Sequence, residues 1–372
     1  MSQAIAKPDT LWYTRCSIPT PLGVGAQLGF YRDEFAADGI AIKSLQESRD
    51  PAETDSHFEH TLPHSFRLGG AVPPIWARAK GQDTRVIGIS WIDEYQAILA
   101  LPGSGIRGAA DLRGRKLALP QRRDRADSVD VARASALRGL LVALELAGLG
   151  QKDAEWVDVP NDRYRDGPNV GAPDTAVRRR QAHSYTSVAH ALVKGEVDAI
   201  YVKDVRGAQT AHLLGALVAV DLGGHPDPYV RINNCTPRPL TINGASLREF
   251  PEVVDRFLRR VVEVGAWARQ HQAEALTQIA RETNWTESWV KLAYGENAHE
   301  HLDVNLEPAS IKGLATFKDF LFQHGFLKQD FAIADWIDPQ PLGRVRAATE
   351  VSPPRAPGRT SASGAGQPRR VA

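Results

Sequence analysis

Three short segments in the first fifth of the chain carry the residue types that thiol chemistry needs. A cysteine, Cys16, is followed downstream by His57-Phe58 and then by Arg67-Leu68-Gly69-Gly70. A thiol becomes reactive only when its neighbours tune its pKa, and imidazole, guanidinium and backbone N–H groups do this. The three segments therefore predict an acid–base thiol that faces an anion-binding turn.

The anion-binding part of this prediction depends on Arg67 and the glycines that follow it. Gly69-Gly70 reads as a turn that opens a helix, and Pro73-Pro74 is tolerated in the first turn of such a helix. Backbone N–H groups at a helix start point outward and bind anions, and a guanidinium can add two parallel hydrogen bonds. We therefore expect anion binding at this turn, with a purely structural glycine turn as the alternative.

The position of Cys16 favours a functional thiol over an inert one. A free cysteine commonly packs as a small hydrophobic residue, and we interpret Cys235, which lacks comparable neighbours, as structural in this way. Leu11 to Thr14 instead reads as a strand that ends just before Cys16. Because ligands of open α/β sheets bind beyond the carboxyl ends of the strands, Cys16 is expected at a binding site.

Two further motifs carry ligand-binding residue types but lack the setting that binding needs. Residues 103–108 match the dinucleotide fingerprint, yet the next strand follows too closely to leave room for the helix that holds the pyrophosphate. The run His57-Phe58-Glu59-His60 with His64 suggests zinc, yet Thr61-Leu62-Pro63 interrupts any single helical face and no fourth ligand is evident. We expect no metal, and interpret His60 and His64 as loop or surface residues.

The composition predicts a soluble protein of two lobes with a basic tail. Of the 372 residues, 42% are hydrophobic and 24% charged, and no run of apolar residues is long enough to span a bilayer. Residues 343–372 hold six arginines and one glutamate, a net charge of +5. Because the whole chain has a net charge of +1, the net charge of the remaining residues is about −4. We expect no nucleic-acid partner, and a disordered tail over 343–372 that is rich in Pro, Gly and Ser.

The two cysteines and the amino terminus bear on location. Two cysteines in a chain of this length do not make a disulfide scaffold, which suits a reducing compartment. The first residues lack the apolar run of a secretory signal. We therefore expect a cytoplasmic monomer without a membrane span, whose partner is a small organic anion.

The apolar runs predict alternating strands and helices. Buried strands are expected over 86–90, 96–101, 116–119, 156–159 and 198–202. Helices are expected over 134–149 and over 246–272. A third helix is expected to carry Val188, Leu192 and Val193 and to end at Gly195. Repeated strand–helix–strand units favour a largely parallel sheet.

This order of elements resembles the type 2 periplasmic-binding-protein-like fold, in which two α/β lobes with mixed, mainly parallel sheets flank a central cleft. The segments that carry the resemblance are 29–40, 110–116 and 194–199. The resemblance implies a discontinuous lobe I over 10–101 and 223–340, and a lobe II over 102–222. It says little about function, because the same scaffold serves transporters, regulators and enzymes.

The sequence is also similar to the cofactor-free sulfinate desulfinases of dibenzothiophene desulfurisation, which are built on this scaffold. The motifs that match are Cys16, His57-Phe58, Arg67, Gly69-Gly70 and Pro73-Pro74. The resemblance implies that Cys16, His57 and Arg67 are catalytic. It also implies a set of substrate-binding residues, namely Gly69, Gly70, Phe58 and Thr14.

The implied activity is that of a carbon–sulfur hydrolase that turns R–SO2⁻ and water into R–H and sulfite without a cofactor. Cys16 would either protonate the carbon that bears sulfur or attack the sulfur, while His57 sets the protonation state of the thiol. The family has a tryptophan near the position of Ser135, and this chain does not. The resemblance therefore implies the type of reaction, but it does not imply an aromatic substrate. The alternative is a substrate-binding protein of an ABC transporter for sulfonates or related small organic anions.

Overall fold

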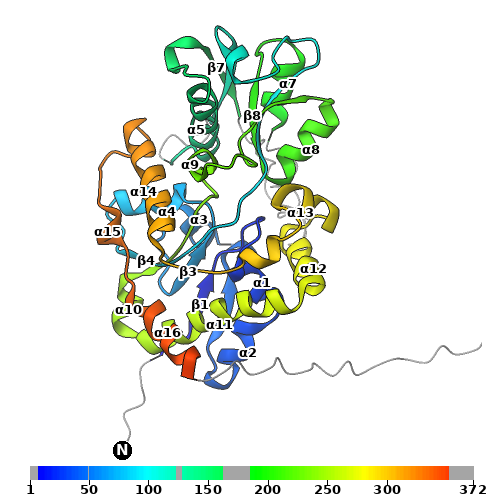
Figure 1. The fold of residues 1–372 in the computed structure, drawn as a ribbon. Coiled ribbons are helices and arrows are strands. Elements are labelled where there is room, and N and C mark those ends of the chain that lie inside the picture. Colours follow the sequence, from blue (N-terminus) through cyan, green and yellow to red (C-terminus); the bar gives the residue numbers. More distant parts are fainter. Residues whose placement is uncertain (1–6, 49, 123–127, 162–184, 352–372) are drawn as a thin grey trace, which may run out of the picture.

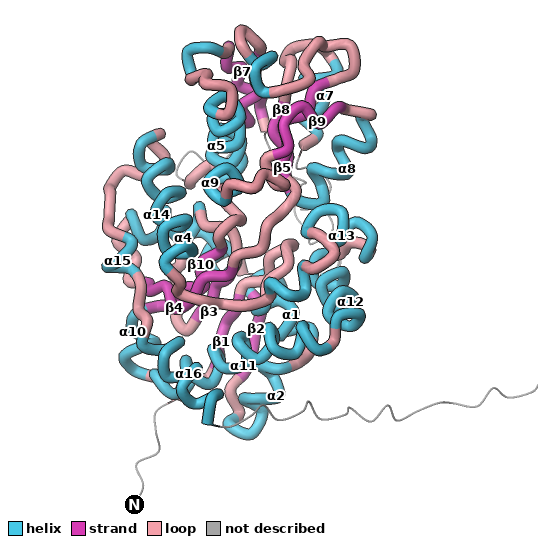
Figure 2. The backbone as a smooth tube through the Cα atoms, in the orientation of Figure 1, coloured by secondary structure: helices cyan, strands magenta, loops and turns pink. Residues whose placement is uncertain are grey.

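The computed structural model describes residues 7–48, 50–122, 128–161 and 185–351. These residues form two α/β lobes, one below the other in Figure 1 and Figure 2. The first lobe is built around a five-stranded sheet in the order β2-β1-β3-β10-β4. Its strands are β1 (Thr10–Tyr13), β2 (Ala41–Ser44), β3 (Ser65–Leu68), β4 (Thr84–Ser90) and β10 (Arg238–Asn243). β1 is parallel to β2 and β3, whereas β10 is antiparallel to β3 and β4, so the sheet is mixed.

Helices cover this sheet on both faces. They are α1 (Pro21–Gln27), α2 (Phe30–Phe35), α3 (Pro51–Glu59), α4 (Val72–Ala79), α10 (Gly244–Glu249), α11 (Pro251–Gln270), α12 (Gln272–Thr283), α13 (Glu287–Tyr294), α14 (Pro308–Gln323), α15 (Ile333–Trp336) and α16 (Gln340–Val351). The buried face of α11 repeats at helical spacing and packs Phe257 against Phe66 of β3, with ring centroids 3.8 Å apart. This packing holds β3, and hence the turn after it, firmly against the body of the lobe.

Among the described residues, the second lobe contains the remaining strands and four helices. The strands are β5 (Gln96–Ala100), β6 (Lys116–Gln121), β7 (Glu155–Pro160), β8 (Ile200–Lys203) and β9 (Leu217–Asp221). The helices are α5 (Val131–Glu145), α7 (Thr186–Val193), α8 (Asp204–Leu214) and α9 (Pro228–Arg231). β5 pairs with β8 and β9, so the chain enters this lobe before Gln96 rather than after Leu101.

The long helix expected over 246–272 is in fact two helices, α10 and α11. Pro251 lacks an N–H and occupies the first turn of α11, where that N–H is not needed, so it begins a new helix. The expectation was wrong because the apolar spacing on either side of Pro251 is continuous, and periodicity alone does not reveal the break.

The predicted disordered tail begins too early, because residues 343–351 belong to α16. Val345 is 1% exposed and packs in the same core cluster as Phe257. Arg344 makes two hydrogen bonds to Asp255 of α11, at 2.6 and 2.9 Å, and Arg346 donates to the Val304 carbonyl. The rest of the predicted tail, 352–372, lies outside the described residues.

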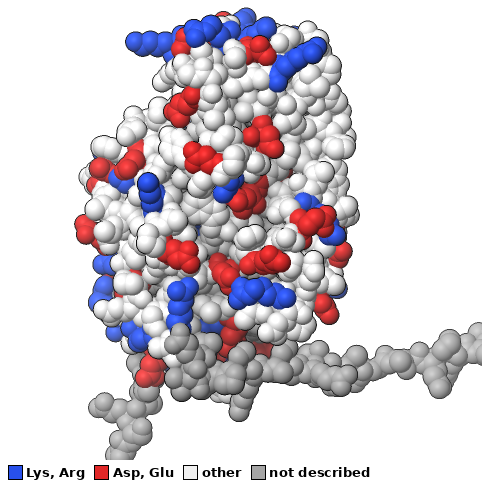
Figure 3. Space-filling model, viewed as in Figure 1, with Lys and Arg blue, Asp and Glu red and all other residues white. Residues whose placement is uncertain are grey.

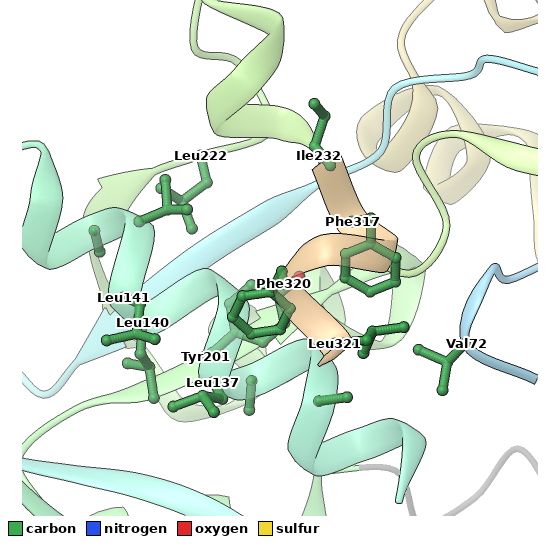
Figure 4. Close-up of a cluster of buried hydrophobic side chains, with 14 of the residues drawn as sticks. Val72, Leu137, Leu140, Leu141, Tyr201, Leu222, Ile232, Phe317, Phe320 and Leu321 are labelled. Atoms are coloured by element: carbon green, nitrogen blue, oxygen red, sulfur yellow. The ribbon is translucent and has the colours of Figure 1, made fainter. Parts of the chain in front are cut away.

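One hydrophobic cluster extends through both lobes. It joins α4 and β4 of the first lobe to α5 of the second, with α14 against them. In Figure 4, Phe317 and Phe320 of α14 lie between the leucines of α5 and Val72 of α4. None of the helices in the described ranges has the length and apolar composition that crossing a membrane requires.

Truncation after Leu342 is expected to lower the melting temperature. It removes the buried Val345 side chain and the Arg344–Asp255 contacts. Burial of a valine contributes about 1.5 kcal/mol or more, and each kcal/mol corresponds to about 2–4 °C in a protein of this size class. Truncation after Val351 keeps these contacts and is the matched control in a thermal melt. Equal melting temperatures for the two truncated chains would show that α16 adds nothing to stability.

Candidate active site

The carboxyl ends of two neighbouring parallel strands bring the predicted site residues together. β1 pairs with β3 so that Tyr13 lies opposite Phe66, and the pairing continues with a hydrogen bond from the Thr14 N–H to the Phe66 carbonyl at 3.0 Å. Cys16 follows the end of β1, and the turn at Gly69-Gly70 follows the end of β3. Residues more than fifty positions apart in the sequence therefore meet at one edge of the sheet.

Contacts on both sides hold Cys16 in place. Before it, the Arg15 guanidinium donates to the buried carboxylate of Glu282 at 2.8 Å. After it, the Ser17 hydroxyl accepts a hydrogen bond at 3.1 Å from Arg206, which lies on α8 of the second lobe. The loop that carries the thiol is thus anchored to both lobes.

The Cys16 thiol lies directly against the backbone of Gly69. A Cβ atom added to Gly69 would collide with Cys16 Sγ, so only glycine allows this approach. Cys16 is a free, partly exposed cysteine, and the protein around it still removes enough water to raise its pKa to about 11, an effect that Arg67 opposes. At neutral pH the sulfur is therefore protonated.

Arg67 is a buried cation without an acidic partner. Only 3% of it is exposed, and its Nε donates to the His57 carbonyl at 3.3 Å. Within the described ranges, Nη1 makes no hydrogen bond and no carboxylate lies within ion-pair distance of the guanidinium. Burial lowers the pKa of Arg67 to about 10, and Cys16 and Cys235 partly offset this. A buried charge of this kind is stable only when something pairs with it, which favours an anionic ligand.

Two more buried polar atoms near Arg67 have no partner among the described residues. One is the hydroxyl of Thr14, a residue that directly follows β1, bonds to the residue before Arg67 and is 1% exposed. The other is Nε2 of His60, whose residue is 8% exposed. Burial and the nearby Arg67 charge lower the pKa of His60 well below its usual range, so its ring is neutral. His60 is thus a loop residue, as interpreted, because it follows the last residue of α3 in a left-handed conformation, but it is buried and not on the surface.

His57 and Phe58 lie on the last turn of α3, as the motif requires. Their rings meet edge to face with centroids 4.8 Å apart, and both residues are half-buried. The His57 carbonyl accepts the hydrogen bond from Arg67 Nε. The role of His57 toward the thiol stays a prediction. His64 is half-buried on the opposite side and bonds through Nδ1 to the Ser246 hydroxyl at 2.9 Å.

The start of α4 differs from the expected open helix N-terminus. The Ala71 N–H donates to the Asn234 carbonyl at 2.5 Å, and the Val72 N–H donates to Asn234 Oδ1 at 2.8 Å. These two donors are therefore unavailable to an anion. Within the described ranges neither the Gly69 N–H nor the Gly70 N–H has an acceptor, so these are the donors of this turn that remain for a ligand. No signal in the sequence pointed to Asn234, which is far away along the chain.

Cys235 lies closer to charged groups than the sequence suggested. It is 5% exposed, accepts a 3.6 Å contact from Asn234 Nδ2, and has Lys203 as a neighbour. Burial raises the pKa of this thiol, and Lys203 works against the shift. Lys203 is paired with the buried carboxylate of Glu94 at 2.8 Å. The interpretation of Cys235 as structural stays a prediction.

Other surfaces of the molecule offer less to a small anion. Two cavities of about 270 and 340 Å³ lie away from Cys16, the first beside Arg138 and Tyr229, the second beside Trp91. Acidic side chains line both. In the described part of the chain no three His, Cys, Asp or Glu side chains gather to hold a metal ion. On the face seen in Figure 3, basic side chains gather at the top, and both signs of charge are mixed elsewhere.

Comparison with known proteins shows which proteins this chain is similar to. No family model matches the sequence. The chain is 27% identical over 364 residues to the 2'-hydroxybiphenyl-2-sulfinate desulfinase of Rhodococcus erythropolis, covering 89% of this chain and 92% of the relative. A crystal structure of a cysteine-to-serine mutant of the desulfurization enzyme DSZB in complex with biphenyl-2-sulfinic acid superposes with a TM-score of 0.69 and 25% identity, over 91% of this chain and 99% of that one.

The chain has the fold of the periplasmic sulfonate-binding proteins. It is desulfinase-like in sequence over most of its length. The alkanesulfonate-binding protein SsuA of Xanthomonas axonopodis pv. citri, bound to MOPS, shares the fold with a TM-score of 0.59 at 16% identity, over 90% of this chain and 99% of that one. The two-lobed α/β architecture expected from the sequence is thereby confirmed.

The raised pKa of Cys16 predicts an unusual alkylation profile. In a Cys235→Ser chain, the rate of reaction with iodoacetamide should keep rising with pH up to about 11, because the reacting thiolate forms only there. The same chain unfolded in urea is the control, and its rate should level off near the ordinary cysteine pKa of about 8.5. A folded-state plateau at or below the unfolded one would contradict a thiol that burial keeps protonated.

Proposed function

We propose that the protein is a sulfinate desulfinase that cleaves a carbon–sulfur bond: R–SO2⁻ and H2O give R–H and HSO3⁻. The observation that carries the proposal is the buried Arg67 guanidinium, with Nη1 unpartnered in the described structure, beside a protonated cysteine. An organic anion supplies the missing counter-charge, and the thiol supplies the proton that the carbon needs. The similarity to a desulfinase along 89% of the chain supports the same reaction.

The sulfinate would bind at the edge where β1 and β3 end. Arg67 Nη1 and the Thr14 hydroxyl would donate to one oxygen, and the Gly70 N–H to the other. Phe58 would line the pocket on the side of α3. Hydrogen bonds to a charged acceptor are stronger than neutral ones, so these few donors suffice to fix the orientation of the sulfinate.

Cys16 would act as the proton donor. The S–H proton moves to the carbon that bears sulfur, the electron pair of the C–S bond forms the new C–H bond, and SO2 leaves. Water then adds to SO2 to give HSO3⁻ and a proton, which returns to the Cys16 thiolate, so atoms and charge balance. Burial raises the pKa of Cys16 to about 11 and so favours the protonated thiol at pH 7, which suits a proton donor better than a nucleophile.

His57 would orient the thiol and assist the return of its proton. Neither of these steps calls for a metal or an organic cofactor. The two free thiols support a reducing, cytoplasmic location, which we include in the proposal.

The decisive test is release of sulfite by the purified full chain from a panel of aryl and alkyl sulfinates. Cys16→Ser should reduce the rate at least about 100-fold, because a positioned proton donor contributes about 10²–10⁴ and a hydroxyl is a far weaker acid. Cys235→Ser is the matched control and should keep most of the activity. Turnover by Cys16→Ser above a tenth of the wild-type rate would remove the catalytic thiol from the proposal.

Arg67→Lys should weaken sulfinate binding although it keeps the positive charge. A lysine offers one flexible point charge in place of the planar fork. In a Cys16→Ser background, which prevents turnover, calorimetric titration should show a dissociation constant raised about tenfold or more. Arg113→Lys, at an exposed position of the second lobe, is the control and should leave the dissociation constant unchanged. An unchanged constant for Arg67→Lys would place the anion elsewhere.

The sulfonate-binding proteins that share the fold make a transport function the second candidate. The unpartnered Arg67 would serve that function equally well. A transport protein gains nothing from a thiol packed against the anion-binding turn, so detectable sulfite release separates the two candidates.

A further inference from the structure

The segment that returns from the second lobe to β10 holds the anion-binding turn through one side chain. Asn234 contacts three consecutive residues: its carbonyl accepts from the Ala71 N–H, its Oδ1 accepts from the Val72 N–H, and its carboxamide lies against Gly70. A Cβ on Gly70 would come within 2.6 Å of Asn234 Nδ2. Asn234 is itself buried, with 6% exposed.

The neighbouring residue fixes Asn234 from the other side. Asn233 Oδ1 accepts from the Asn234 N–H at 2.7 Å, and Asn233 Nδ2 donates to the Ser135 carbonyl and the Tyr201 hydroxyl of the second lobe. A pair of backbone hydrogen bonds between Asn233 and Thr236 closes the loop. The carboxamide of Asn234 therefore has one defined position, set by the second lobe.

The consequence concerns the number of donors that a ligand finds. A helix start offers several outward N–H groups and suits an anion with three oxygens around its central atom. Here Asn234 takes the N–H groups of Ala71 and Val72, and among the described residues the N–H groups of Gly69 and Gly70 remain without an acceptor. The N–H groups left in the turn match the two oxygens of a sulfinate, whereas the Asn234 oxygens already occupy the helix-start donors that a third oxygen would need.

We propose that Asn234 is a specificity-determining residue that makes the site select a sulfinate over the corresponding sulfonate. This inference rests on the proposed function and assigns its substrate discrimination to a residue that does not react. Removal of the carboxamide exposes the Val72 N–H at the start of α4 to the third sulfonate oxygen. Discrimination should therefore fall without loss of the anion site.

The test compares dissociation constants of biphenyl-2-sulfinate and biphenyl-2-sulfonate, which differ by one oxygen, in the full chain carrying Cys16→Ser. The unmodified Asn234 should favour the sulfinate by about tenfold or more. Asn234→Ala should reduce that ratio to near one. Asn234→Asp keeps an acceptor for the Val72 N–H, so it should weaken both ligands yet preserve the ratio.

A matched control separates specificity from stability. Asn243→Ala removes a comparable bond, from the Ser65 N–H to a side-chain oxygen at the opposite end of β3, and should lower the melting temperature without altering the ratio. Equal affinity for the two ligands with Asn234 intact, or an unchanged ratio in Asn234→Ala, would overturn the inference. Absence of sulfinate binding and turnover in the unmodified chain would instead overturn the proposed function.

Discussion

The buried guanidinium of Arg67 is the constraint on which the rest of the site depends. An interior cation is tolerated when hydrogen bonds and an opposite charge surround it, and here the described chain provides one carbonyl and no carboxylate. Packing of Phe66 against α11 holds its strand, and Glu282 and Arg206 anchor the loop that carries Cys16 opposite. Among the described residues the scaffold thus leaves a positive charge without a counter-charge, which a single bound anion would supply.

The same charge would serve both halves of the proposed reaction. Before proton transfer the negative charge is on the sulfinate, and afterwards it is on the Cys16 sulfur, and both positions adjoin Arg67. Burial keeps the thiol protonated against the pull of Arg67 until the carbon accepts the proton. A fixed donor that stabilises the negative charge both before and after proton transfer needs little reorganisation during the reaction. Preorganised sites lower activation barriers in this way.

Local rules predicted much of this arrangement, and distant contacts account for what they missed. The convergence of Cys16 with Arg67 follows from two parallel strands ending at one edge. The inward turn of His60 depends on a left-handed cap of α3, and the loss of free donors at α4 depends on Asn234 far along the chain. Neither leaves a periodic or compositional signal. Val345 was predicted to lie in a disordered tail because the arginines around it dominate the local composition. In the structure the buried Val345 and the ion pair between Arg344 and Asp255 hold α16 against α11.

A scaffold that also binds alkanesulfonates needs few changes to do chemistry on a related anion. The anion donors, Arg67 and the turn after β3, are what a binding protein would require. What a binding protein would not require is the absence of a side chain at Gly69, which lets the Cys16 sulfur reach the turn itself. Because no larger residue fits at that contact, the requirement for glycine at position 69 comes from the thiol and not from the anion. The placement of a proton source within the anion site, rather than the site itself, is therefore the structural argument for catalysis.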